Sequence, residues 1–261
     1  MQHRLEIDLS RCVGCGSCMY ECSQYIPRIL DKKCVLPEAD MQRCHGCGHC
    51  VAVCPTDALV LDGMRELLPS CAPVRMSPEE RSDLFRGRRS IRHYRQEAVP
   101  RDVLENCLDM ARFAPTGGNS QQVEWLCADS PHVLRRVIEG VVRWARRQGG
   151  FYARMAAFHD QGHDSVLRGA PGLALAHARA DSHWAAHDCS IAASYLELAL
   201  HSVGVGSCWA GLVILALKDG EDLGLAVPDG RRVEAGLMYG YPTVRYRRLP
   251  HKLPQRIVYL S

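Results

Sequence analysis

The sequence predicts an α+β protein built in two parts, and three observations predict it. The chain has 261 residues, more than one small hydrophobic core needs. Eight of its 14 cysteines lie in two runs within the first 54 residues, which indicates a small separate N-terminal part. Beyond them, helical periodicity alternates with short apolar segments, and we expect helices at 101–114, 131–147 and 188–203 and strands at 123–128, 172–178 and 232–240.

The composition and charge exclude several classes of protein. Hydrophobic residues make up 47% of the chain and charged residues 23%, which is typical of a globular protein and not of a fibre or a disordered tail. The net charge of +3 requires no polyanionic partner, so we expect no nucleic acid. Residues 1–8 carry charges where an export signal needs an apolar run, and the longest apolar stretch, 203–217, is too short to span a bilayer. We therefore expect a cytoplasmic protein that does not enter a membrane.

The cysteine spacing predicts iron–sulfur clusters. Each run reads C-x2-C-x2-C-x3-C, and Pro55 follows the second run whereas Ser23 follows the first. This pattern resembles the bacterial two-cluster ferredoxins, in which the fourth cysteine of each run binds the other cluster. The resemblance therefore implies two [4Fe-4S] clusters, one held by Cys12, Cys15, Cys18 and Cys54 and the other by Cys44, Cys47, Cys50 and Cys22. Zinc is the alternative for such pairs, but no spacer separates the pairs within each run.

Other features of the N-terminal part agree with this interpretation. Glycines inside both runs allow the loops to turn their amides toward sulfur, at positions 14, 16, 46 and 48. Residues 5–8 and 58–62 read as short strands on either side of the runs, and we expect residues 1–62 to form a ferredoxin-like domain with pseudo-twofold symmetry. The six remaining cysteines are interpreted as buried or incidental thiols: Cys34, Cys71, Cys107, Cys127, Cys189 and Cys208.

A linker that contains a helix is expected between the two parts, over residues 63–87. Ser77 is a good N-cap, with Pro78 at the first helical position and Glu80 at the third, and the helix should run to about Gly87. Five arginines follow at positions 86 to 95. Alone they would indicate a solvated face or a nucleic-acid patch, although no aromatic interleaving supports the second.

Residues 88–261 are expected to form one domain, which resembles the nitroreductase-like FMN-dependent oxidoreductases. The resemblance covers about residues 86–250 and depends on five ordered matches: RRSIRHY at 88–94, APTGGNSQQ at 114–122, GAP at 169–171, GVGSCWAG at 204–211, and GYP at 240–242 ahead of Arg245, Arg247 and Arg248. It implies a nitroreductase-like FMN fold in which helices flank a mixed sheet. It also implies a homodimer with FMN at the interface and chain ends exchanged between protomers.

The resemblance assigns roles to matching residues. A phosphate grip is implied at Arg88, Arg89, Ser90 and Arg92, closed by Arg247 or Arg248, because guanidinium forks and a hydroxyl match a dianion. Flavin-lining roles are implied for Pro115, Thr116, Gly117, Asn119 and Gln121, and the reactive N5 edge is placed near Trp209, Ala210 and Gly211. The family often has proline where this chain has Gln122. No catalytic side chain is indicated.

A cluster moves one electron whereas a flavin accepts electrons singly and releases a pair, so the fusion predicts an oxidoreductase that converts between the two. No G-x-G-x-x-G follows a strand, so the sequence contains no dedicated nicotinamide site, although the resemblance implies that the flavin could react with NAD(P)H directly. We expect reduced ferredoxin or a similar donor. The expected acceptor is an electron-poor small molecule, either a nitro compound, a quinone or an activated C=C. The alternatives are an electron carrier or redox sensor without an organic substrate, and a flavin-fragmenting enzyme of the same fold.

Two further segments have alternative interpretations. His183, His187 and Asp188 could bind a metal, since histidines four residues apart share a helical face, but a capping role at the start of the long helix is favoured. The segment 149–168 contains Phe151, Tyr152, Met155, Phe158 and His159. These side chains could roof a flat substrate over the flavin, or they could simply pack a surface helix.

Overall fold

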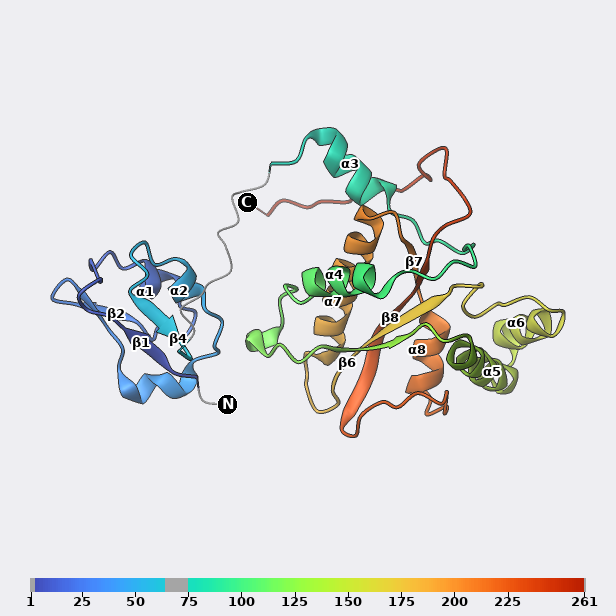
Figure 1. Ribbon diagram of the computed structural model, residues 1–261, viewed down its shortest axis with the longest axis horizontal. Helices are drawn as coiled ribbons and strands as arrows, with labels where there is room; N and C mark the ends of the chain where they lie inside the picture. The colour runs from blue at the N-terminus through green and yellow to red at the C-terminus, as the bar shows by residue number, and fades with distance from the viewer. Residues whose placement is uncertain (1–2, 64–74, 261) are drawn as a thin grey trace. The chain divides into compact units, whose positions relative to one another are not determined.

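The computed structural model describes residues 3–63 and 75–260, and the chain divides into two compact units (Figure 1). The first unit comprises Met1–Arg75 with Gly117–Ser120, and the second comprises Met76–Thr116 with Gln121–Ser261. Cys71 and residues 64–74 of the expected linker lie outside the described residues.

The first unit contains two small antiparallel sheets. Strand β1 (Leu5–Ile7) pairs with β4 (Leu59–Leu61), which confirms strands at the two ends of the cysteine-rich segment. Strands β2 (Arg28–Leu30) and β3 (Lys33–Val35) form a hairpin between the two cysteine runs. The remaining elements are short helices: α1 (Ser17–Glu21), η1 (Glu38–Arg43), α2 (His49–Ala52) and η2 (Gly117–Asn119).

The two cysteine runs repeat the same backbone conformation. Gly14 and Gly46 have φ of 68° and 60°, and Gly16 and Gly48 have φ of 80° and 72°. These values lie in the left-handed region that glycine adopts without steric cost. Helices α1 and α2 begin directly after Gly16 and Gly48. The repeated spacing in sequence is thus a repeated local structure.

The second unit is built on a four-stranded sheet of order β5–β6–β8–β7. Its strands are β5 (Glu124–Ala128), β6 (Gly172–Arg179), β7 (Gly206–Trp209) and β8 (Arg231–Gly240). Every hydrogen-bonded pair of these strands is antiparallel, so the expectation of a mixed sheet is wrong for the described chain. The crossover between β6 and β7 does give two strands of the same direction, but β8 lies between them and separates them. The only parallel pairing within residues 3–63 and 75–260 is the isolated bridge between Ser90 and Ser207.

Helices cover both faces of this sheet: α3 (Pro78–Gly87), α4 (Arg101–Ala111), α5 (Pro131–Gln148), α6 (Gly150–Asp160), α7 (Ala185–Ser202) and α8 (Gly211–Lys218). The expected capping box of α3 is present, since Ser77 and Glu80 exchange hydrogen bonds. Helix α5 agrees with expectation, α4 ends three residues early, and α7 begins three residues early. Helix α8 and strand β7 were not predicted, and α6 is the surface helix that was one of the two interpretations of the segment 149–168.

Alternating residues of β6 divide the core into two layers. Leu173 and Leu175 pack into a cluster with side chains of α5, α6 and α8. Ala174 packs on the other face, in a cluster with side chains of α4 and α7. A strand buried on both faces reads as a continuous apolar run, as the segment 172–178 does. Figure 1 shows α4 and α7 together, apart from α5 and α6.

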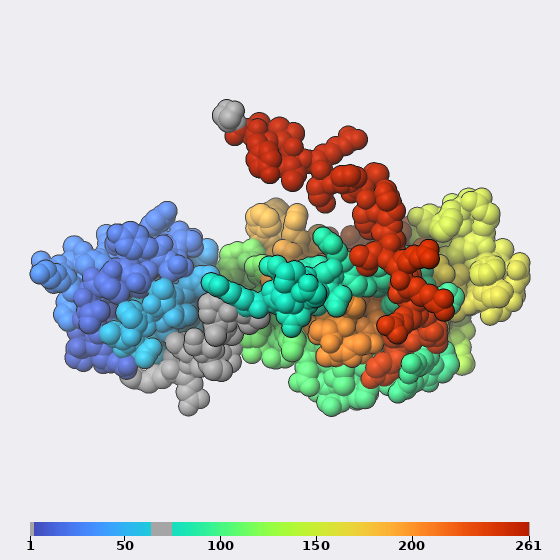
Figure 2. Space-filling model, turned by 90° about the horizontal axis from the view of Figure 1, so that it is seen from above, coloured from blue at the N-terminus to red at the C-terminus, as the bar shows by residue number. Residues whose placement is uncertain are grey.

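The C-terminal segment has no regular structure after residue 242 in the part described. Its apolar side chains are strongly exposed: Leu253, Ile257, Val258, Tyr259 and Leu260. Figure 2 shows the segment in red, with much of its surface open to solvent. Among the described residues, no helix is long and apolar enough to cross a membrane.

Candidate functional site

The two predicted cysteine sets line two separate cavities of the first unit. The first cavity is lined by Cys12, Cys15, Cys18 and Cys54, as predicted, and additionally by Cys34. The second is lined by Cys22, Cys44, Cys47 and Cys50. In each cavity three cysteines come from one run and the fourth comes from the other run. The structure therefore assembles the same groups that the ferredoxin resemblance implies.

Backbone amides point at the cysteine sulfurs in both sets. The amides of Cys34 and Ala58 donate to the sulfurs of Cys12 and Cys54, each at 3.3 Å. The amides of Ile26 and Gly46 donate to the sulfurs of Cys22 and Cys44, each at 3.5 Å. Such hydrogen bonds stabilise negative charge on sulfur. Sulfur atoms held this way are suited to act as thiolate ligands.

The electrostatic surroundings differ between buried and exposed cysteines. Burial, together with the neighbouring thiols of Cys22, Cys47 and Cys44, raises the pKa of Cys50 to about 12. The hydroxyl and amide of Ser17 lower the pKa of Cys15 at the surface. Crowded thiols resist ionisation together unless a cation neutralises them, which is what iron would supply.

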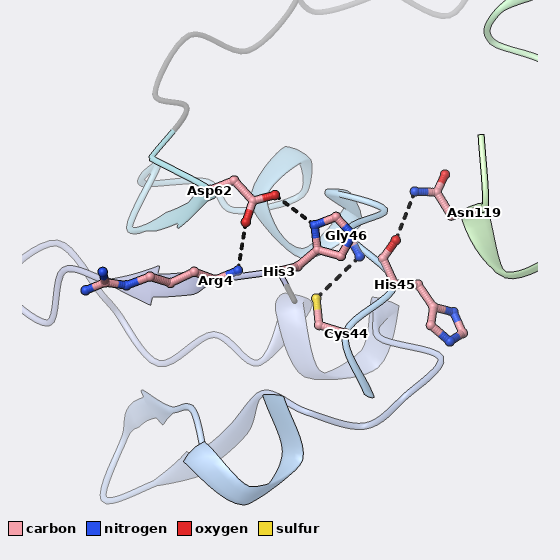
Figure 3. Close-up of polar contacts among 7 residues, drawn as sticks. All are labelled: His3, Arg4, Cys44, His45, Gly46, Asp62 and Asn119. Carbon is pink, nitrogen blue, oxygen red and sulfur yellow. Dashed lines mark hydrogen bonds and ion pairs between the residues drawn. The ribbon is translucent and has the colours of Figure 1, made fainter. Parts of the chain in front are cut away.

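Polar contacts join β1 to β4 beside Cys44, one of the cysteines that line the second cavity (Figure 3). Asp62 accepts from His3 Nδ1 at 2.8 Å and from the Arg4 amide at 2.7 Å, which closes the pairing of β1 with β4. The His3 ring lies against Gly46, where a Cβ would come within 2.4 Å of a ring atom. Gly46 is therefore required both by its φ and by this close approach.

The described residues contain no group of three His, Cys, Asp or Glu side chains arranged to hold a single metal ion. His183 and His187 are exposed, whereas Asp188 is buried. We expected Asp188 to begin α7, but the helix begins three residues earlier, at Ala185, with Trp184 as its N-cap. Asp188 lies in the first turn instead.

In the second unit, three of the sequence motifs meet at one place. The amide of Ile91 donates to the carbonyl of Ser207 at 2.9 Å. The amide of Arg95 donates to the carbonyl of Tyr241 at 2.8 Å, and the amide of Thr243 donates to the carbonyl of His93 at 3.1 Å. Segments more than 100 residues apart in sequence thus lie side by side.

A cavity of about 280 Å³ lies beside this junction, with three arginines in its wall. Its lining includes Arg88, Arg89 and Arg245, together with His201 and backbone of residues 204–207. Arg92, Arg247 and Arg248 are not among the lining residues, and neither is Ser90. Of the three arginines after the GYP motif, Arg245 lines this cavity with Arg88, whereas Arg247 or Arg248 was expected there. In the sequence, only the position of Arg245 after GYP could have indicated this.

Arg88 has a buried partner that the sequence did not indicate. Its Nη1 lies 3.0 Å from Glu197 Oε1 on α7, and the glutamate is 8% exposed. Burial raises the pKa of Glu197, although the Arg88 charge and hydrogen bond oppose that shift. A buried carboxylate requires a partner, and here the partner is Arg88. The ion pair therefore fixes the position of one guanidinium group in the wall of the cavity.

The two ends of the loop 116–121 line another cavity of the second unit, of about 150 Å³. Thr116 and Gln121 lie in its wall, and the Gln121 amide donates to Thr116 Oγ1 at 3.0 Å. Pro115 is exposed. Gly117 and Asn119 belong to the first unit, where Asn119 Nδ2 donates to the carbonyl of His45 at 3.1 Å (Figure 3).

Gln122, where the family often has proline, anchors the end of this loop. Its Nε2 donates to Ser182 Oγ at 2.7 Å and to Asp188 Oδ2 at 3.2 Å. Its carbonyl accepts from Arg231 Nη2 at 2.5 Å, and Arg231 Nε donates to His177 Nδ1 at 2.7 Å. A side-chain amide here has a structural role that proline could not supply.

The segment expected at the flavin N5 edge joins β7 to α8. The Ala210 amide donates to the carbonyl of Gly236 at 2.9 Å, and Gly211 is the first residue of α8. A Cβ at Gly211 would meet no atom within 4 Å, so no neighbour within the described chain requires glycine there. Trp209 is 37% exposed beside it.

The aromatic segment 149–168 contains helix α6. Tyr152 packs edge-to-face on Trp144 of α5, with ring centroids 5.0 Å apart, and Phe158 stacks on His163. Phe151 is 64% exposed. Tyr152 and Met155 therefore have packing roles, while Phe151 remains open to a role in binding.

Comparison with known proteins identifies the family. Residues 85–241, more than half of the chain, match the nitroreductase family. This chain belongs to the nitroreductase family. Residues 37–60, which contain the second cysteine run, match the 4Fe-4S binding domain.

Curated relatives and solved structures are similar to part of the chain. A Methanothermobacter thermautotrophicus protein, provisionally named NADH dehydrogenase/NAD(P)H nitroreductase, is 27% identical over 50% of this chain and 60% of its own length. Bacillus subtilis YfhC, provisionally named NAD(P)H nitroreductase, is 26% identical over 61% of this chain and 83% of its own. The crystal structure of a Bacteroides fragilis nitroreductase with bound FMN superposes with a TM-score of 0.56, at 22% identity, over 67% of this chain and 96% of that one.

Proposed function

We propose that this nitroreductase-family chain is an iron–sulfur flavoprotein oxidoreductase that reduces an electron-poor small molecule. Electrons would come from reduced ferredoxin or a similar donor, and the acceptor would be a nitro compound, a quinone or an activated C=C. When bound, two [4Fe-4S] clusters would supply single electrons and FMN would collect them in pairs. The observation that carries the proposal is the sorting of eight cysteines into two cavities, each lined by the four cysteines proposed for one cluster.

The cysteine residues fit the clusters by chemistry as well as by number. Each set combines three cysteines on a tight glycine-bearing loop with one cysteine from the other run. Amide hydrogen bonds reach sulfur in both sets, which offsets part of the charge that a cluster adds. Cys12, Cys15, Cys18 and Cys54 would hold one cluster, and Cys44, Cys47, Cys50 and Cys22 the other.

The arginine-lined cavity fits the phosphate of FMN. Arg88 and Arg89 come from the segment that the family resemblance assigns to the phosphate, and Arg245 joins them from the C-terminal motif. Three guanidinium groups around one cavity suit a dianion. Phosphate-binding roles for Ser90, Arg92, Arg247 and Arg248 are proposed from the family resemblance alone, because none of these residues lines the cavity.

The flavin ring would extend toward the segment 209–211. Gly211, at the start of α8, offers backbone N–H groups and no side chain. The N-terminus of a helix favours electron-rich atoms, which is suitable for a reduced flavin. Pro115, Thr116, Gly117, Asn119 and Gln121 would line the ring of a partner protomer.

A homodimer is supported by the exposed C-terminal segment. Leu253 is 83% exposed and Tyr259 is 86% exposed, and apolar side chains of this kind need a cover. A second copy of the chain would provide it. Sedimentation of the full chain should give a dimer, and removal of residues 249–261 should give a monomer that has lost its flavin; a monomeric full chain with stoichiometric FMN would contradict this.

The proposal is tested by cofactor analysis followed by an acceptor panel. Anaerobically reconstituted protein should contain about eight iron atoms and one FMN per chain. The fully reduced protein should then be reoxidised by at least one nitro compound, quinone or activated alkene. Stoichiometric cofactors without reoxidation by any of the three classes would favour an electron carrier or redox sensor instead, and four iron atoms or fewer would refute the two-cluster arrangement.

A further inference from the structure

The first cysteine cavity contains one thiol more than a cluster needs. A [4Fe-4S] cluster has four corners, and the second cavity is lined by four cysteines. The first cavity is lined by five, because Cys34 joins Cys12, Cys15, Cys18 and Cys54. Cys34 lies outside both runs and was interpreted from sequence as incidental.

Cys34 is directed at the ligands and not away from them. Its Sγ lies 3.7 Å from Cys18 Sγ, and its amide donates to Cys12 Sγ at 3.3 Å. The residue is 2% exposed, and the burial pattern of β3 places Cys34 inward while Lys33 is exposed. Its side chain therefore faces the same interior as the cluster ligands.

The hairpin that carries Cys34 is fixed to the loop of the first run. Lys33 Nζ donates to the carbonyls of Leu9 and Cys12, at 2.9 Å and 2.6 Å. A Cβ at Gly14 would come within 2.1 Å of the Lys32 carbonyl oxygen, so loop and hairpin are in close contact. The position of Cys34 beside Cys18 is therefore set by backbone contacts and not by a free side chain.

We propose that Cys34 is a reserve iron ligand of the first cluster, able to occupy the corner that Cys18 normally holds. The inference rests on the proposed function, since it requires a cluster in this cavity. In the exchange an Fe–S bond to the residue at position 18 is absent or broken, and one Fe–S bond to Cys34 forms. When Cys18 leaves, its thiolate takes up the proton that the Cys34 thiol releases; when position 18 has no thiol, that proton goes to solvent. No electron is transferred. A small movement of one side chain suffices, because the two sulfurs are already in contact.

Four variants test the inference by anaerobic iron analysis and by electron paramagnetic resonance of the reduced protein. Cys34→Ala should keep the wild-type count of about eight iron atoms, because four ligands remain. Cys18→Ala should also keep about eight, with a changed spectrum for the first cluster. The double variant Cys18→Ala/Cys34→Ala should fall toward four. Cys15→Ala is the matched control and should also fall, since Cys15 is exposed whereas Cys34 lies against Cys18.

The outcomes separate this inference from the proposed function. Wild-type protein with four iron atoms or fewer would refute the two-cluster proposal itself. Eight iron atoms in the wild type, with equal iron content and equal spectra in Cys18→Ala and the double variant, would refute the role of Cys34 alone. Loss of the first cluster in Cys34→Ala, with circular dichroism unchanged, would also overturn it, because Cys34 would then be an obligatory residue. Cys18→Ser repeats the test with a side chain of similar size.

Discussion

The two units accommodate charge in opposite ways. The first unit surrounds cysteine sulfur with backbone amides that come from nearby turns, such as Gly46 beside Cys44. The second unit gathers arginine side chains from distant segments, and Arg88 and Arg245 are more than 150 residues apart. A site made of local turns depends on each ligand, whereas a site made of several long side chains shares its binding energy among them. The comparison predicts large all-or-none effects in the first unit and graded effects in the second.

The largest effect, a loss of iron, is expected for a cysteine of the cavity lined by Cys22, Cys44, Cys47 and Cys50. Cys47→Ala removes one of the four proposed ligands, and no fifth cysteine is among the lining residues of that cavity. Iron content after anaerobic reconstitution should fall from about eight to about four atoms per chain. Cys127→Ala, an exposed cysteine of the second unit, is the control and should keep the wild-type value. Full iron content in Cys47→Ala would show that the second set is not the ligand set.

A graded effect is expected in the arginine-lined cavity. Arg89→Ala and Arg245→Ala each remove one charge-assisted contact, worth roughly 1.5–3 kcal/mol, and should weaken FMN binding about tenfold or more. Arg81→Ala, on the exposed face of α3, is the control. Equilibrium titration of apoprotein with FMN measures the effect. If Arg92→Ala weakens binding while Arg245→Ala does not, the phosphate lies outside this cavity.

A stability effect is expected at the end of the APTGGN loop. Gln122→Ala leaves Ser182 and the buried Asp188 without their amide donor, which should lower the free energy of unfolding by about 1–3 kcal/mol. Urea denaturation of this variant and of the exposed control Gln148→Ala gives the difference. Equal stability of both variants would mean that the amide contributes nothing there.

The smallest effect is a pH dependence at His177. Burial, followed by the nearby Arg231, lowers the pKa of His177 below its ordinary value of about 6.5. Below pH 6.5 the unfolded chain therefore binds a proton that the folded chain does not, and stability should fall as the pH decreases, by at most about 1.4 kcal/mol per pH unit. His177→Gln should flatten this dependence, whereas the exposed His187→Gln should retain it.

Sequence predicted most of the first unit because its information is local. The cysteine spacing predicted which four cysteines line each cavity, and the glycines between the cysteines have the left-handed φ that their positions required. Cys34 was missed because it becomes part of the cavity only through the β2–β3 hairpin. A turn with positive φ at Asp31 and Lys32 positions it, and no spacing rule indicates that.

The second unit was predictable in its elements and not in its contacts. The strands at 172–178 and 232–240 were predicted because short segments rich in apolar residues indicate buried strands. The segment 203–217 was too apolar and too rich in glycine to reveal that it splits into β7 and α8. The contacts of Arg88 with Glu197 and of Gln122 with Asp188 join residues 109 and 66 positions apart, and only the packing of α7 brings them together.

The central claim is that electrons enter through the cysteine-rich unit and reach an acceptor from the flavin. The most direct test is anaerobic stopped-flow mixing of reduced ferredoxin with wild-type protein and with Cys47→Ala, with flavin absorbance as the readout. Wild-type flavin should be reduced rapidly, and the variant, with its FMN retained, should be reduced at least tenfold more slowly because one cluster is missing from the path. Equal rates of flavin reduction in the two proteins would contradict the claim.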